Sequence, residues 1–387
     1  MNRIFFLTAA IPFFPSATLC AGPGTFPDKS PAPAARSGGW RFSAGYMHRS
    51  LGDFDWLTGT RSVPSLLTIG QGSNTPGIDA IGPADLFFNR TYNDGFNFQD
   101  GGTAGSGDTW NWGYQNASQV SGDMISFHGG NGTTATFTDS DNYEYGGWSE
   151  NLDGNAPFFQ LEWIQPLTGS LNFGFQGSVS FLDTGAARTL ATFTADKSRT
   201  DYSILYTDRY QLGGVIVPQA PYTGGPQGPG ALIPNIPVGR TAANTISGGE
   251  TATAFNSIHT DFDLNLAAIS LGPVIEYARG PFALQASAGL TINVAAWDVE
   301  QRETLFVSRN GATATAQNNW RDRNDGTSVL PGIFLQAAAS RELNEHWSLN
   351  AFGRYDWVES LSLGAGPSIG SANLSGWSLG AGVGFRF

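Results

Sequence analysis

The sequence predicts an all-β protein whose strands close into an antiparallel transmembrane β-barrel of about twelve strands, with about ten or fourteen also possible. Three observations support this fold class. Long segments alternate apolar with polar residues, short connections alternate with long ones, and the last strand has one face that is apolar throughout. No apolar run reaches the roughly 20 residues that a membrane-spanning helix requires.

The clearest strand covers residues 282–296, where every second position from Phe282 to Ala296 is apolar and the positions between are mostly small or polar. Strands of soluble proteins average about 5–6 residues, whereas a tilted strand that crosses lipid needs roughly 9–11. The same alternation recurs over residues 40–46, 171–181 and 347–357. Residues 262–277 change phase after Leu266, which predicts a β-bulge near Ala267. The number of strands within 84–155 stays open.

The connections differ in length in a way that is typical of membrane barrels. Short connections at 166–170, 278–281 and 341–346 are predicted to be tight periplasmic turns. Long connections at 51–84, 212–256, 308–327 and 363–374 are rich in Gly, Pro, Asn and Ser, and we expect them to face outward as loops. Aromatic residues near strand ends are expected to form an interfacial girdle: Tyr46, Trp163, Tyr277, Trp297, Trp347, Trp357 and Trp377.

The composition excludes some classes of partner and indicates how the chain is organised. The net charge is −12 and only two of the basic residues are lysines, so a nucleic-acid partner is not expected. Residues 1–21 have the pattern of a signal peptide, and residues 22–38 are a Pro-, Ala- and Gly-rich segment expected to be a periplasmic linker. The single cysteine, Cys20, lies in the expected signal. Residues 39–387 are then predicted to form one barrel domain.

The last strand places the protein in a membrane more firmly than any other segment. Residues 375–387 put Trp377, Leu379 and further apolar residues on one face, and small residues and Arg386 on the other. Gly382, Phe385 and Phe387 match the carboxy-terminal pattern G-x-x-Φ-x-Φ, where Φ is apolar, and the strand resembles the closing strand of Gram-negative outer-membrane β-barrel proteins of a porin-like type. That resemblance implies localisation in the cell outer membrane, contact with its lipids and lipopolysaccharide, and insertion by the barrel-assembly machinery.

Once the outer face is known, strand parity predicts which polar side chains point into the barrel. This set consists of Glu162, Gln176, Asp263, Glu276, Gln285, Arg354, Asp356 and Arg386. In a channel these residues would set the field that a solute meets, and in a closed barrel they would pair as a buried polar plug. The leading hypothesis is a narrow or gated channel for small solutes. The alternative is a non-conducting surface, adhesion or envelope-structural barrel.

No sequence motif makes an enzyme the preferred interpretation. Outer-membrane phospholipases carry the motif His-x-Ser-Asn-Gly, but no serine follows His128 two residues later. A hydrolase at the barrel rim is therefore the least favoured alternative. It would gain support if His128 or His48 lay beside a serine or carboxylate in an external cleft. We expect no cofactor and no specific metal site, with Asp139, Asp141 and Glu144 as weak calcium candidates. Asn93-Asp94-Gly95 is predicted to form a tight turn.

The segment 213–239 is apolar and proline-rich for an exposed loop. Proline fixes one backbone angle and so makes such a segment stiffer than an ordinary loop. Two placements remain open for it: a lid or constriction in the barrel mouth, and a protruding surface loop.

Overall fold

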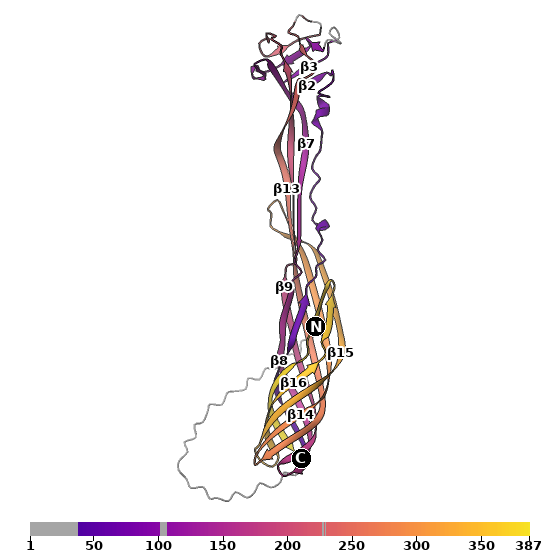
Figure 1. Ribbon diagram of the computed structural model, residues 1–387, viewed down its shortest axis with the longest axis vertical. Helices are drawn as coiled ribbons and strands as arrows, with labels where there is room; N and C mark the ends of the chain where they lie inside the picture. The colour runs from indigo at the N-terminus through magenta and orange to yellow at the C-terminus, as the bar shows by residue number, and fades with distance from the viewer. Residues whose placement is uncertain (1–37, 101–106, 227, 229) are drawn as a thin grey trace, which may run out of the picture.

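The computed structural model describes residues 38–100, 107–226, 228 and 230–387, and its central feature is a closed ring of antiparallel strands (Figure 1). The predicted signal peptide and residues 22–37 of the predicted linker lie outside the described residues. The ring closes where β1 pairs with β19, from Arg41 opposite Arg386 to Leu51 opposite Gly376. In ring order, the strands are β1 (Gly39–Leu57), β8 (Gly147–Thr168), β9 (Leu171–Leu190), β13 (Gly239–Arg279), β14 (Phe282–Arg309), β15 (Thr315–Glu342), β16 (Trp347–Val358) and β19 (Gly376–Arg386).

The fold class is confirmed, but the predicted strand count is wrong, because the ring within the described residues has eight strands. The residues expected to supply further barrel strands instead extend away from the ring. The described parts of 58–146 and 191–251 lie in the predicted barrel domain 39–387 but add no strand to the ring, and β10 joins it only through its pairing with the long strand β13. Individual strands are also far longer than a bilayer requires, since β13 alone has 41 residues. No helix in the described part of the chain is long and apolar enough to cross a membrane.

The three predicted tight turns are present at one end of the ring. Residues 169–170 join β8 to β9, residues 280–281 join β13 to β14, and residues 343–346 join β15 to β16. Gly169 and Gly280 have φ of 54° and 58°, a conformation that residues with a Cβ rarely adopt. By the rule that short turns of such barrels face the periplasm, we take this end as the periplasmic end and the opposite end as the extracellular end.

The outer surface near the periplasmic end is apolar, and this band ends abruptly along each strand. On β13, Ile269 and Leu271 are 54% and 65% exposed on the outside of the ring, where hydrocarbon would cover them. Further toward the extracellular end, Phe262, Leu264 and Leu266 of the same strand are buried inside the ring. The apolar side chains therefore change from the outer face to the inner face where the strand leaves the membrane.

This change of side occurs without the predicted bulge. The pairing of β13 with β9 continues without a shift from Ile258 to Tyr277, so Ala267 is an ordinary strand position. Above the bilayer the outside of the barrel meets water and the inside must be apolar, whereas within the bilayer the requirement is reversed. The phase change in the sequence is thus caused by a change of surroundings and not by an extra residue.

An apolar core fills the ring at its extracellular end. Phe54 of β1 is fully buried there and stacks on Phe262 of β13 with a centroid distance of 4.4 Å, while Trp148 of β8 packs edge-on at 5.1 Å. A hairpin of β17 (Leu361–Ala365) and β18 (Ser368–Ala372) contributes Leu361, Leu363 and Ala372 to the same cluster. Trp297, predicted for the girdle, also packs against this core. We call this cluster the apolar plug.

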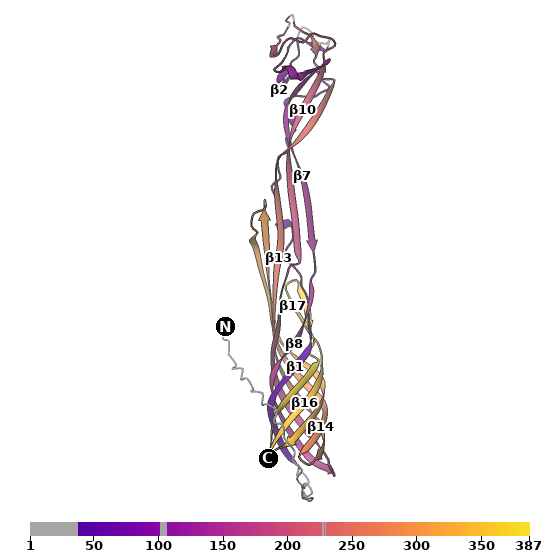
Figure 2. The ribbon, with the colours of Figure 1, turned by 90° about the vertical axis from the view of Figure 1, so that its left-hand side faces the viewer.

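A narrow stalk continues outward from the barrel and ends in a small head (Figures 1 and 2). The stalk is a three-stranded sheet of β7 (Met124–Tyr143), β10 (Phe193–Gln211) and the first half of β13. β10 follows β9 after two residues, and β7 leads into β8 after three. The 19 residues of β10 span ~60 Å at about 3.3 Å per residue. A strap of residues 58–76, which includes η1 (Pro64–Leu66), connects β1 to the head along the stalk sheet.

The head consists of short elements from residues 77–123 and 212–238. One small sheet contains β2 (Arg90–Tyr92), β3 (Gly95–Asn97), β5 (Trp112–Tyr114) and β11 (Tyr222–Thr223), and a second pairs β4 (Asp108–Thr109) with β12 (Ile233–Pro234). The remaining elements are η2 (Gly77–Ala80), η3 (Ala117–Gln119) and β6 (Val120–Ser121). Asn93 and Asp94 form the predicted tight turn, between β2 and β3.

Two predicted loops have other structures. Most of 308–327 belongs to β14 and β15, whose pairing extends from Phe282 opposite Arg341 to Val307 opposite Thr315. Its residues lack apolar alternation because polar side chains occupy both faces, and backbone pairing together with cross-strand bonds such as Arg323 to Asp298 holds them. Segment 213–239 is not a lid in the barrel mouth but lies in the head, where Trp112 donates from Nε1 to the Ala231 carbonyl at 2.7 Å.

Candidate functional site

The polar interior of the barrel contains most of the residues predicted to face its lumen. Glu162, Gln176, Glu276 and Asp356 are almost fully buried there, and Gln285 and Arg354 donate hydrogen bonds within the same interior. Arg386 lies at the periplasmic mouth, where its guanidinium pairs with Glu342 at 3.6 Å. Asp263 is the exception. Its side chain is exposed on the outside of the ring. Asp263 lies in the part of β13 beyond the membrane, where the apolar side chains face inward and the polar ones outward.

Glu276 is the centre of a hydrogen-bonded network in the periplasmic half of the barrel. Arg41, which the parity prediction missed, forms a bidentate ion pair with it across the ring. Asn172 and Gln285 also donate to the Glu276 carboxylate, at 2.7 Å and 3.0 Å. Arg41 belongs to the first strand of the ring and Glu276 to the fourth, so only closure of the barrel brings the two charges together. No periodicity in either strand could have indicated this pair.

Glu162 occupies a neighbouring position in the network. It accepts from Gln160 at 2.6 Å and from Gln285 at 3.2 Å, and Gln160 also donates to Gln176 at 3.1 Å. These side chains cross-link the strands from inside. Bonds of this kind hold the interior together and leave little width for a solute.

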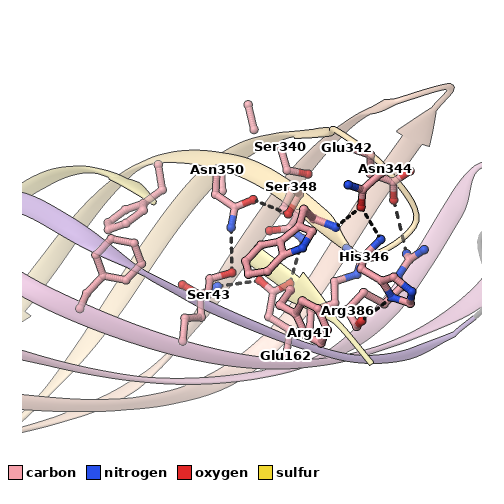
Figure 3. A pocket seen from close by; sticks show the side chains of 18 of the residues that line it. Arg41, Ser43, Glu162, Ser340, Glu342, Asn344, His346, Ser348, Asn350 and Arg386 are labelled. Atoms are coloured by element: carbon pink, nitrogen blue, oxygen red, sulfur yellow. Dashed lines mark hydrogen bonds and ion pairs between the residues drawn. The ribbon is translucent and has the colours of Figure 1, made fainter. Parts of the chain in front are cut away.

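A polar pocket opens at the periplasmic mouth (Figure 3). Its cavity measures about 40 Å³, enough for a few water molecules. The view shows Asn350, which donates to Ser43 at 2.7 Å, and His346, whose ring nitrogen lies 3.2 Å from the Arg386 carbonyl. Phe158 and Phe352 lie at the inner side of this pocket, with their rings edge-to-face at 4.9 Å. The pocket is therefore a shallow vestibule.

A smaller cavity of about 20 Å³ lies deeper in the barrel. Phe158, Gln160, Gln336 and Phe352 line both cavities and thus form the wall between them. Beside the deeper cavity, Arg354 donates hydrogen bonds of 2.6–3.1 Å to the Asp356 carboxylate. The Arg354 guanidinium also lies 4.2 Å from the centre of the Phe334 ring.

The three residues of the predicted assembly signal lie on β19 or just after it, at the seam of the ring. Gly382 pairs with Gly45 of β1 and with Asn350 of β16, and a Cβ at Gly382 would come within 2.4 Å of the Ala44 carbonyl oxygen. Phe385 packs edge-on against Trp347 at 5.0 Å, and Phe387 is exposed beside it. Glycine is required at position 382 by this close approach of neighbouring backbones.

The weak metal candidates do not assemble. Asp139 and Asp141 lie on the stalk strand β7, and Asp139 pairs with Lys197 at 3.1 Å. Within the described residues, no group of three or more His, Cys, Asp or Glu side chains is placed to hold a metal ion.

His259 lies 3.9 Å from Asp261, and the two candidate histidines of the sequence also have a neighbouring carboxylate. His128 on the stalk strand β7 lies 2.7 Å from Asp94 of the head, and His48 on the outside of the barrel lies 3.7 Å from Asp153. Neither histidine lines either of the two cavities described above. The Asp94 carboxylate also accepts the His128 backbone N–H at 2.8 Å, so this pair fixes the turn between β2 and β3 against β7.

A buried polar network joins the head to the stalk. The Tyr92 hydroxyl donates to Asp208 at 2.6 Å and lies 2.7 Å from the Tyr210 hydroxyl, and Arg240 holds the same Asp208 carboxylate from the other side at 2.5–2.7 Å. Burial raises the pKa of Tyr210 to about 12 and also raises that of Tyr92. Sequence reasoning missed this network because its members come from three separate segments.

These phenols predict how stability depends on pH. Since folding raises the Tyr210 pKa, its contribution to the stability of the head is complete below the unfolded value of about 10 and is lost as pH rises from there to about 12. Tyrosinate absorbance and circular dichroism, followed together, should show a late ionisation step that coincides with loss of head structure. Tyr210→Phe should reduce the amplitude of that step, and an unchanged amplitude would contradict the assignment.

The outer surface of the head carries exposed apolar residues. Leu86, Phe87 and Phe88 follow one another with exposed fractions of 56%, 46% and 40%. Their loop is fixed from beneath by Arg90, whose buried guanidinium donates to carbonyl oxygens of Leu86, Phe88 and Asn235. The loop therefore presents large apolar side chains on a rigid support. We call Leu86–Phe88 the tip patch.

Comparisons with known proteins find structural likeness alone. No family model matches the chain, and no curated protein matches it. Similar solved structures include the outer membrane protein OprG from Pseudomonas aeruginosa, at 8% identity and a TM-score of 0.32, covering 92% of this chain and 99% of that one. The outer membrane protease OmpT from Escherichia coli has 7% identity and a TM-score of 0.26, covering 93% and 99%. A Pseudomonas aeruginosa FadL homologue has 10% identity and a TM-score of 0.21, covering 90% of each chain. Superpositions this loose carry no argument about activity.

Proposed function

Because the chain is an outer-membrane β-barrel protein, we propose that its barrel is a non-conducting anchor and that its stalk displays the head for adhesive contact with another surface. The observation that carries this proposal is the stalk, a continuous sheet that raises the head ~60 Å beyond the barrel. Such an extension has no role in conducting a solute, but it moves a binding surface away from the lipid.

The interior of the barrel supports the anchor role. The ring has eight strands, a size that side chains fill, and here they do so in two layers: the apolar plug at the extracellular end and the Glu276 network at the periplasmic end. A solute would have to displace a stacked aromatic cluster and then separate buried ion pairs. These observations favour the non-conducting alternative over the small-solute channel.

The head has the features of a contact surface. The tip patch exposes three consecutive large apolar residues, and exposed aromatic side chains dominate the energy of many protein interfaces. The Arg90 and Asp208 networks keep the head ordered, so little conformational entropy is lost when it binds. His346 lines the periplasmic pocket together with Ser43, but the bonds of His346 go to the Arg386 carbonyl and those of Ser43 to Asn350, so we assign them no catalytic role.

A headless variant tests the proposal. Two replacements remove the head. Gly-Gly can replace residues 77–131, because Thr75 pairs with Thr133 just below them. An Asn-Gly turn can replace residues 206–242, because Leu205 lies opposite Ala243. We expect a non-adherent strain to gain surface attachment or aggregation from the full chain, and to lose most of that gain with the headless variant. Heat-modifiable electrophoretic mobility checks that the barrel has inserted.

The matched control shortens a different extracellular hairpin by replacing residues 310–314, between β14 and β15, with Asn-Gly. This variant should attach as well as the full chain. Equal attachment by the headless variant would contradict the adhesive role. Steady ion conductance by the full chain in planar bilayers would contradict the anchor role and restore the channel hypothesis.

A further inference from the structure

The deeper cavity of the barrel has an unbalanced charge. Arg49, Arg354 and Asp356 are its charged lining residues, so two guanidinium groups share one carboxylate. Arg354 makes the close bonds to Asp356, whereas the nearest Arg49 nitrogen remains 3.9 Å from that carboxylate. The Arg49 side chain is 2% exposed and cannot obtain compensation from bulk water. A buried cation without a close counterion is costly, which indicates that a further negative group belongs here.

Strand register places the two cations around one small residue. Ser378 of β19 lies opposite Arg49 of β1 on one side and opposite Arg354 of β16 on the other. All three residues line the cavity. The backbone thus holds both guanidinium groups and the Ser378 hydroxyl in a single row across three adjacent strands.

The unpaired groups in this region share one chemical property, since all of them can donate. Arg49 Nε, Ser378 Oγ and Asn293 Nδ2 are buried and have no hydrogen-bond partner among the described residues. Asn293 lies beside the Arg49 guanidinium, from which its amide oxygen receives a long bond of 3.5 Å. Arg49 and Ser378 line the cavity, so an occupant that only accepts hydrogen bonds and carries negative charge would satisfy their donors and the surplus cation together.

We propose that the barrel binds one halide ion, chloride under ordinary conditions, between Arg49, Arg354 and Ser378. The cavity volume of about 20 Å³ limits the occupant to one small particle, and the wall of Phe158 and Phe352 separates it from the periplasmic vestibule. Phosphate, sulfate and carboxylates are too large for this space. The ion would neutralise the surplus charge and lock β1, β19 and β16 together at the seam of the ring.

The test measures thermal unfolding of the full-length protein folded in detergent, in sodium chloride or sodium gluconate at equal ionic strength. A ligand that binds only the folded state raises the midpoint, and we expect a saturable rise of about 2–4 °C with chloride. Arg49→Met removes the surplus cation and should abolish this dependence. Arg323→Met, which removes an exposed cation of β15 outside the cavity, should retain it.

Crystals grown in sodium bromide provide a second readout that needs no variant. An anomalous peak between the Arg49 and Arg354 guanidinium groups is expected. A midpoint that is the same in chloride and gluconate, together with no anomalous peak at this position, would overturn the proposal and assign the donors to a water molecule. If Arg49→Met fails to fold, the bromide peak in the natural protein still decides between these outcomes.

Discussion

Replacing Phe54 by alanine should lower the free energy of unfolding by about 3–5 kcal/mol, the range for removing a large aromatic side chain from a packed core. Phe54 is fully buried at the centre of the apolar plug and contacts Trp56, Trp148 and Phe262 through its ring. Its removal leaves a cavity between stacked aromatic rings that the barrel wall cannot collapse to fill. Urea titration of the detergent-folded protein, followed by tryptophan fluorescence, measures the loss.

Phe42→Ala is the matched control for this variant. Phe42 lies on the same strand but faces lipid, with 39% of its surface exposed. Its truncation removes contact with hydrocarbon and creates no cavity in a core, so the cost should be clearly smaller. Equal losses for the two variants would mean that Phe54 does not lie in a packed plug, and the proposed seal of the barrel would lose its main support.

Glu276→Gln should have the second large effect, a loss of about 3 kcal/mol, because it leaves the partly buried Arg41 guanidinium without its counterion. Glu276 is fully buried, and Asn172 and Gln285 also donate to its carboxylate. The amide that replaces it carries two donors of its own, which would meet these existing donors. Unfolding in urea again measures the change, with barrel insertion checked by electrophoretic mobility.

A double-mutant cycle separates the interaction energy of Arg41 with Glu276 from the other effects of each substitution on stability. Arg41→Met alone should also destabilise, whereas Arg41→Met combined with Glu276→Gln should cost less than the sum of the two single changes. Additive losses would show that the two side chains do not interact across the barrel. Asp263→Asn serves as a control, since this carboxylate lies on the outside beyond the membrane and its replacement should change stability little.

The sequence predicted the membrane part of the fold well because lipid imposes a strict period of two. Leu284 and Leu290 are exposed on the outer face, and Glu162, Gln176 and Glu276 are buried inside, as their parity required. Parity failed at Asp263. The rule that apolar residues face outward applies only within the bilayer, and the phase change after Leu266, which marks where β13 leaves it, predicted a bulge instead.

The strand count and the head could not be predicted for a related reason. Residues 315–327 and most of β7 contact water on both faces, so their side chains carry no periodic signal, although backbone pairing makes them strands. The aromatic and charged residues of the head come from segments that are far apart in the chain, as with Tyr92 and Asp208. Only the folded stalk brings them together.

The sequence by itself determined that the protein is a membrane barrel and which side chains line its wall within the lipid. These properties follow from alternation along single strands. The tertiary structure alone decided that eight strands close the ring, that Arg41 meets Glu276, and that a stalk carries the head away from the membrane. The physical reason is that such contacts depend on which strands become neighbours, and no local pattern of residues encodes that choice.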